Sequence, residues 1–180
     1  MREGELIMFE QRGKSLKEWI SIYETKTGDR VELPYNYRLC YLAERGFCML
    51  KPDIEGKMML VYQVCGDGKF WRDYSELQAA GMGLDCVGTI CTRAIEPYIR
   101  SFGWEILSKT EINGQRRYRC QDSIGRLIIC TYKCEGDKEG MPPHYWVTHY
   151  LNKKATESVV MAPTRSKDEN KEGEEIVCGI

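Results

Sequence analysis

Residues 58–69 carry the pattern that decides the fold, and they read MMLVYQVCGDGK. The first seven of them are apolar on both sides of a strand, which is typical of a strand in the middle of a covered sheet. Two glycines then mark a tight turn. Beyond the turn, Phe70, Tyr74 and Leu77 recur at helical spacing. This stretch therefore predicts a central strand, a sharp turn and a helix that packs back onto the sheet.

Working outward from this stretch, helical and strand patterns alternate and then give way to strands. Ser15 and Glu18 form a capping-box pattern ahead of an apolar helical face, and Gly28 follows that helix as a turn signal. A second helix is expected over 95–102, with Pro97 in its first turn. Strands are predicted at 46–50, 57–64, 86–91, 104–107, 115–121, 126–132 and 144–151.

Size and composition describe an ordinary globular chain. It has 180 residues, 42% hydrophobic and 29% charged, with a net charge of −1 and a pI near 6.2. This balance argues against a binder of nucleic acid that uses its whole surface. No apolar run approaches the roughly 20 residues of a membrane helix, and the start of the chain lacks the pattern of a secretory signal. We therefore expect a cytoplasmic protein whose nine cysteines are reduced.

The chain divides into one domain and a tail. Residues 1–151 are predicted to form a single α+β domain, in which 115–151 make a carboxyl-terminal β-hairpin extension. Residues 152–180 change character, since 167–175 contain no large apolar side chain. Such a segment cannot bury enough surface to offset its ordering entropy, so we expect a flexible polar tail.

The glycine turn has the features of an anion site. Gly66 and Gly68 leave backbone N–H groups uncovered, and the following helix adds its own free N–H groups and the positive end of its dipole. Lys69 near the first turn adds positive charge, whereas Asp67 between the glycines opposes it. The alternative reading is an ordinary turn without a ligand.

The order of elements around this turn resembles a known superfamily. Residues 63–68 fit the Gln/Arg-x-x-Gly-x-Gly/Ala signature of the GNAT acyltransferases, placed between the long central strand and the next helix as in that family. A strand at 86–91, a short helix and Gly103-Trp104, where the family commonly has Gly-Phe, extend the likeness over residues 45–107.

This resemblance implies a GNAT-like mixed sheet with flanking helices, split between its two central strands, with acetyl-coenzyme A in the split. The pyrophosphate would rest on the glycine turn, and the pantetheine arm would pair with the backbone of 62–64. Transfer of the acetyl group to an amine would use a general base, often with a tyrosine that reprotonates the thiolate. The cofactor-binding residues implied are Gln63, Val64, Cys65, Gly66, Gly68 and Lys69.

The catalytic residues depart from the family pattern. The tyrosine position is occupied by Ile99, so its neighbour Tyr98 is the candidate acid, and no carboxylate lies in the central strand to act as base. Glu44, Asp53 and Glu55 are only near it in sequence. A second hypothesis is therefore a non-enzymatic protein on the same scaffold. It would be an inhibitor or accessory protein of a phage or mobile element that acts on a host protein, for example a nuclease, or on a nucleic-acid-processing complex.

Two other groups of residues carry side chains with ligand-binding chemistry. Cys130, Cys134, His144 and His149 have zinc-ligand chemistry, but two histidines five residues apart in a strand face opposite sides, so no metal is expected. A basic hairpin combines arginines with an aromatic residue, which can hold phosphates and stack a base; the alternative is a solvated sheet face. Its residues are Arg116, Arg117, Arg119 and Arg126, with Tyr118 between them.

Overall fold

The fold is an α+β arrangement of one mixed eight-stranded sheet and three helices, in a computed structural model that describes residues 13–112, 114–133 and 143–156. The helices are α1 (Leu16–Thr27), α2 (Gly68–Gly81) and α3 (Ile95–Ser101). The strands are β1 (Arg38–Leu42), β2 (Gly46–Asp53), β3 (Met58–Gly66), β4 (Cys86–Cys91), β5 (Glu105–Ile112), β6 (Gln115–Gln121), β7 (Arg126–Lys133) and β8 (His144–Lys154).

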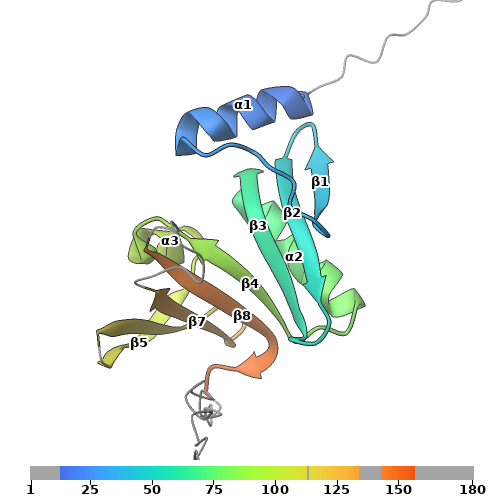
Figure 1. Ribbon diagram of the computed structural model, residues 1–180. Helices are drawn as coiled ribbons and strands as arrows, with labels where there is room; N and C mark the ends of the chain where they lie inside the picture. The colour runs from blue at the N-terminus through green and yellow to red at the C-terminus, as the bar shows by residue number, and fades with distance from the viewer. Residues whose placement is uncertain (1–12, 113, 134–142, 157–180) are drawn as a thin grey trace, which may run out of the picture.

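The strands follow the order β1-β2-β3-β4-β8-β7-β6-β5 across the sheet. Only β3 and β4 are parallel, joined by α2 as a crossover helix, and all other neighbours are antiparallel. Figure 1 shows β3 and β4 meeting at one end and spreading apart toward the other. The hairpin of β6 and β7 joins the same sheet through β8, so the carboxyl-terminal strands continue the core rather than forming a separate unit.

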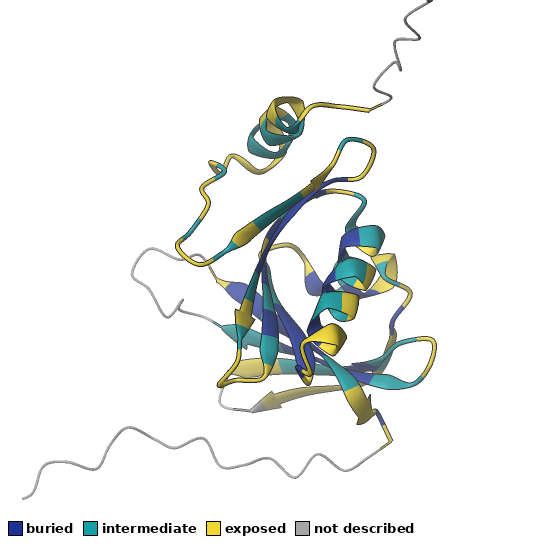
Figure 2. Ribbon diagram, turned by 90° about the vertical axis from the view of Figure 1, so that its right-hand side faces the viewer, coloured by how far each residue is buried: buried dark blue, intermediate teal, exposed yellow. Residues whose placement is uncertain are grey.

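Helices cover both faces of the sheet. Trp71 and Ala79 of α2 pack on the side chains of Val61 and Val87, and α3 packs on the same face through Ile99. On the opposite face, α1 lies over the end of β2 and β3, where the Tyr23 and Phe47 rings are 5.9 Å apart. Figure 2 shows the buried residues concentrated on the strands and on the helix faces that cover them.

Local sequence signals explain where α1 begins and ends. The Ser15 side chain accepts the backbone N–H of Glu18, whose carboxylate in turn accepts the backbone N–H of Ser15 at 2.7 Å. These bonds satisfy amides that have no partner within the helix. At the other end, Gly28 adopts a left-handed conformation with φ of 76°. The predicted capping box and stop signal are both confirmed.

Each predicted strand is present, but several run further than predicted, with β2 reaching Asp53 and β5 reaching Ile112. The edge strand β1 was missed, since five residues with no clear alternation carry little signal. The last strand runs three residues beyond its predicted end, to Lys154, and Ala155 after it is buried. Residues 157–180, most of the predicted tail, lie outside the described residues. Within the described ranges, no helix combines the length and hydrophobicity needed to cross a bilayer.

Candidate functional site

The site is a cavity where the two parallel strands separate. Pairing of β3 with β4 covers only Met58–Val61 against Cys86–Thr89, although β3 continues to Gly66 and β4 to Cys91. Past Val61, the edge of β3 that faces β4 therefore has no strand to pair with. A cavity of about 640 Å³ opens at this point.

Both faces of the sheet contribute to the cavity wall. The end of α1 supplies residues on one face, and α2, α3 and β8 supply residues on the other, so the cavity passes through the divergence between the strands. The residues that line the cavity include Lys26, Asp29, Val61, Tyr62, Val64, Cys65, Gly66, Gly68, Trp71, Arg72, Ser75, Val87, Thr89, Cys91, Arg93, Tyr98, Phe102, Trp104, Val147 and His149.

The two glycines of the turn differ in their surroundings. Gly66 has a φ of 98°, and a Cβ added to it would lie 2.2 Å from the carbonyl oxygen of Arg45. This glycine is therefore required for the close approach of β2 and β3. A Cβ added to Gly68 would meet only the Phe102 ring, at 3.8 Å. The backbone at Gly68 thus stands open toward the cavity.

Asp67 occupies the amino-terminal end of α2. Its Oδ1 accepts the backbone N–H of Phe70 at 3.0 Å, and its Oδ2 lies 2.5 Å from the Arg45 guanidinium. The bond from the Phe70 amide, with Arg45 beside it, holds the pKa of the Asp67 carboxyl below its usual value. The helix end is thus capped by its own carboxylate, and an anion would have to bind beside that carboxylate, on the glycine side of the turn.

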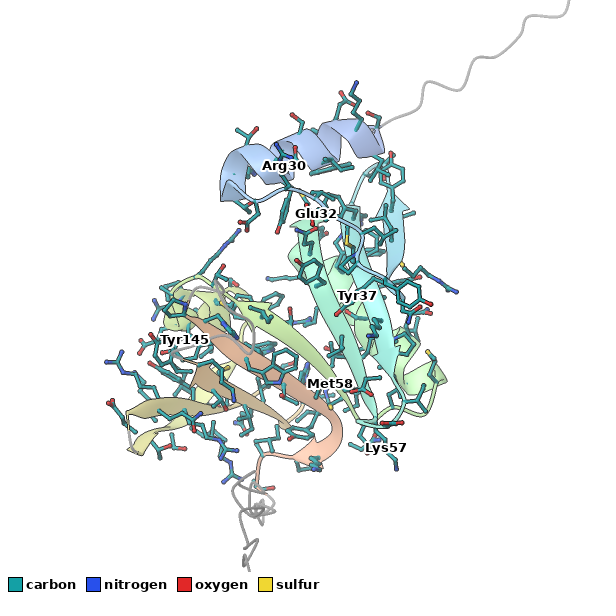
Figure 3. The ribbon with its side chains drawn as sticks, viewed as in Figure 1. Arg30, Glu32, Tyr37, Lys57, Met58 and Tyr145 are labelled. Carbon is teal, nitrogen blue, oxygen red and sulfur yellow. The ribbon has the colours of Figure 1, made fainter. Side chains whose placement is uncertain are left out.

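Four of the six predicted cofactor-binding residues line the cavity, namely Val64, Cys65, Gly66 and Gly68, whereas Gln63 and Lys69 do not. Lys69 is exposed on the surface. The buried Gln63 donates from Nε2 to the carbonyl oxygen of Arg30 at 3.0 Å. Gln63 therefore anchors the segment between α1 and β1 that crosses β3, where Figure 3 labels Arg30, Glu32 and Tyr37.

Cys65 is a cavity residue without the features of a nucleophile. Its side chain is 8% exposed, and its Sγ lies 3.6 Å from the carbonyl oxygen of Trp19. Burial raises the pKa of the Cys65 thiol. The thiol therefore remains protonated near neutral pH, which fits a packing role.

Tyr98 faces the cavity, while its neighbour Ile99 is fully buried in the core. The Tyr98 ring packs against Phe102 and Trp104, at centroid distances of 4.9 and 6.0 Å. Burial raises the pKa of the Tyr98 phenol above its usual value, so the hydroxyl keeps its proton. Of the two side chains, Tyr98 is the one placed to donate a proton within the cavity.

Cations outnumber carboxylates along the cavity wall. Lys26, Arg72 and Arg93 line it, and Asp29 is the one carboxylate among the described lining residues. Arg72 lies over the Phe102 ring at 5.3 Å and pairs with Asp73 at 2.7 Å and Glu76 at 3.6 Å, so Lys26 and Arg93 are the cations that add to the charge of the wall. This excess of positive charge favours an anionic ligand. Lys26 of α1 and Arg93, between β4 and α3, lacked a sequence signal because they meet only in the folded chain.

The carboxylates that are near the central strand in sequence lie away from the cavity. Glu44 is in the turn between β1 and β2, and Asp53 and Glu55 are at the turn between β2 and β3. None of the three lines the cavity.

A buried ion cluster, which the sequence did not indicate, borders the cavity beneath α2. The His149 ring lies between two carboxylates, with Nδ1 2.9 Å from Glu76 and Nε2 3.2 Å from Asp122. Arg126 contacts the same two carboxylates, at 2.8 and 2.6 Å. The cluster connects α2, the β6–β7 turn and β8. Both nitrogens of this cavity-lining histidine thus lie within 3.2 Å of a carboxylate oxygen.

The predicted basic hairpin is spread over three environments. Arg117 and Arg119 share one face of β6 through their alternation, and Arg119 donates to the carbonyl oxygen of Ala155. Arg116 lies on the other face and pairs with Glu111 at 3.3 Å. Arg126 is in the buried cluster, with a side chain 21% exposed. The fold therefore does not bring these four arginines into one patch.

The described members of the cysteine and histidine group also lie in different surroundings. Cys130 is fully buried in the core beside α3, His149 is in the ion cluster, and Cys134 lies outside the described residues. In the described part of the chain, no group of three His, Cys, Asp or Glu side chains is arranged so that it could hold a metal ion.

Comparisons with known proteins identify neither a family nor a function for this chain. The chain matches no family model, and neither a curated protein nor a solved structure shows significant similarity to it.

Proposed function

We propose that the protein binds an acyl-coenzyme A and transfers its acyl group to an amine. The observation that carries this proposal is the cavity between β3 and β4, which opens where the parallel strands diverge beside the amino-terminal end of α2. The GNAT resemblance of residues 45–107 predicts a coenzyme in the same place.

The chemistry of the cavity matches the parts of such a coenzyme. The edge of β3 past Val61 has no partner from β4, so its backbone is available to the amides of a pantetheine arm. The open backbone at Gly68 and the exposed lining cations Lys26 and Arg93 suit a pyrophosphate. The Asp67 carboxylate places a negative charge beside this anion site. The ion pair between Asp67 and Arg45 reduces the repulsion between that carboxylate and a phosphate.

The reaction requires two proton movements. The amine nitrogen attacks the thioester carbonyl, the new C–N bond forms as the C–S bond breaks, and coenzyme A leaves as its thiolate. The protonated phenol of Tyr98 is the donor we assign to the thiolate. Asp29, the one carboxylate among the described lining residues, is the acceptor we assign to the amine proton.

One observation favours a second candidate. Because the Asp67 carboxylate already caps α2, the helix end has its own anion in place. A protein that uses this scaffold only to bind a macromolecular partner, such as an inhibitor of a phage or mobile element, would need no phosphate ligand at this end of α2. The test below separates the two candidates.

The test is thermal unfolding of the full chain with increasing coenzyme A and acetyl-coenzyme A. A ligand at 100 times its Kd stabilises the folded state by about 2.7 kcal/mol, so the melting temperature should rise with concentration. The variant Gly68→Leu fills the open backbone site next to Phe102 and should abolish this rise.

The matched control is Gly81→Leu, at the other end of the same helix, where an added Cβ meets nothing within 4 Å. It should retain the full response to coenzyme A. A wild-type protein that ignores coenzyme A but elutes together with a purified partner complex would overturn the proposal in favour of the binding protein.

A further inference from the structure

Two cysteines face each other at the edge of the sheet. The edge strand β1 pairs with β2, and the register places Cys40 directly opposite Cys48. Figure 1 shows β1 alongside β2 at the outer edge of the sheet. Directly opposed residues of an antiparallel pair point to the same face, with Cα atoms about 4.5 or 5.5 Å apart. Both spacings fall within the window of roughly 4.4–6.8 Å that a disulfide requires.

The two side chains differ in their exposure to solvent. Cys48 is fully buried in the apolar cluster between the sheet and α2, whereas Cys40 packs against this cluster and is only half-buried. The two thiol groups also lie within hydrogen-bond reach of each other. Burial, with Cys40 beside it, raises the pKa of the Cys48 thiol. Cys40 is therefore the thiol that a reagent in solution meets first.

No other two of the described cysteines stand opposite each other. Cys120 and Cys130 lie on neighbouring strands, but Cys120 is opposite Ile128 and Cys130 is opposite Tyr118. They are thus diagonal neighbours, whose Cα atoms are roughly 7–8 Å apart in a regular sheet. A disulfide across that spacing would require the backbone to move. The register therefore singles out Cys40 and Cys48.

We propose that Cys40 and Cys48 form a redox-active dithiol, which a small-molecule disulfide such as oxidised glutathione converts into one cross-strand disulfide. The inference is independent of the proposed function. In the first step, the Cys40 thiolate attacks the glutathione disulfide and releases one glutathione. Cys48 then attacks the Cys40 sulfur and releases the second. Each cysteine loses one proton, and the glutathione disulfide takes up two electrons to become two thiols.

The disulfide would fix the strand on which α1 is anchored. The carbonyl oxygen of Ala43, in the β1–β2 turn, accepts the Lys14 amide at 2.9 Å and Trp19 Nε1 at 3.0 Å. The Tyr41 hydroxyl donates to the Lys14 carbonyl oxygen at 2.6 Å. Edge elements with few neighbours open more readily than the core of a sheet. A covalent link between β1 and β2 should therefore protect both β1 and the start of α1 from local opening.

The experiment treats the full chain with oxidised glutathione, blocks the remaining thiols and maps the disulfides after digestion with trypsin. The two cysteines fall in separate peptides, because Arg45 lies between them. The peptides span 39–45 and 46–57, since trypsin does not cut between Lys51 and Pro52. We expect the two peptides to be joined after oxidation and to separate on reduction with dithiothreitol.

The oxidised chain should also be more stable than the reduced chain. Closing a short loop in the unfolded chain should lower the equilibrium constant for unfolding by about tenfold to a hundredfold. For a chain of this size, the melting temperature should rise by about 3–10 °C. Amide exchange across β1 should slow by about tenfold, which thiol chemistry elsewhere in the chain would not produce.

Variants identify the pair that is responsible. Cys40→Ser removes the half-buried thiol and should abolish both the joined peptides and the gain in melting temperature. The matched control Cys130→Ala removes a buried cysteine of the diagonal pair and should retain both. If the control does not fold, the peptide map of the wild-type chain still decides the result.

Two results would overturn the inference. One is a wild-type chain in which Cys40 carries glutathione while the peptides 39–45 and 46–57 stay separate. The other is a disulfide that joins Cys40 or Cys48 to a different cysteine. Neither result bears on coenzyme A, whose binding the thermal titration of the reduced chain tests separately.

Discussion

Replacement of Gly66 by alanine tests whether the first glycine of the turn is there for the backbone rather than for a ligand. A Cβ at this position would lie 2.2 Å from the carbonyl oxygen of Arg45 and 3.0 Å from the Cα of Gly46. Both neighbours are backbone atoms, so no side-chain rotation can relieve the contact. The ends of β2 and β3 must move apart instead.

The size of the effect follows from what this movement breaks. A left-handed φ of 98° costs alanine roughly 1–2 kcal/mol. The Arg45 carbonyl oxygen also accepts the Asp67 amide at 2.9 Å and Trp71 Nε1 at 2.8 Å. Losing two hydrogen bonds costs about 0.5–1.5 kcal/mol each. The free energy of unfolding should therefore fall by about 2–5 kcal/mol.

Urea unfolding followed by tryptophan fluorescence measures this directly, and the denaturant slope should stay unchanged. For a chain of this size, the loss corresponds to a melting temperature about 4–20 °C lower. Gly68→Ala is the matched control, because its Cβ would meet only a ring atom at 3.8 Å and its backbone is not left-handed. A Gly66→Ala protein within about 1 kcal/mol of wild type would refute the reasoning.

Two further predictions concern residues around the cavity. Although burial alone would raise them, ion pairs lower the pKa values of Glu76 and Asp122. The stability that these carboxylates contribute is therefore present above their unfolded values of about 4 and is lost as pH falls through the lower folded values. Asp122→Asn should flatten the stability profile between about pH 5 and pH 2, and an unchanged profile would contradict this. Gln63→Ala removes the donor to the Arg30 carbonyl, so amide exchange across residues 30–37 should speed up about fivefold; unchanged exchange there would show that other contacts hold the segment.

Much of the fold follows from local signals in the sequence. The capping box at Ser15 and the stop at Gly28 specify α1 without reference to the rest of the chain. The two-sided apolar run in β3 and the turn at 122–125 likewise predict a central strand and a hairpin. These features depend on residues a few positions apart, which is why periodicity and turn chemistry are sufficient to find them.

The sequence predicted only part of the candidate site, because local spacing finds a turn but not the direction in which each side chain points. The turn after β3 was found because its glycines are adjacent in sequence, and four of its residues line the cavity. Gln63 matched the same signature but faces the other way, toward Arg30. One-dimensional spacing does not record on which side of a strand such a residue is used.

What the sequence alone determined is therefore the set of elements and the position of the glycine turn. Tertiary structure decided the rest: that β3 and β4 separate after four paired residues, and that α1 and the segment between β4 and α3 bring cations to the opening. It also decided that His149 lies between Glu76 and Asp122. The physical reason is distance along the chain, because these groups come from separate elements and meet only when the sheet and its helices have packed.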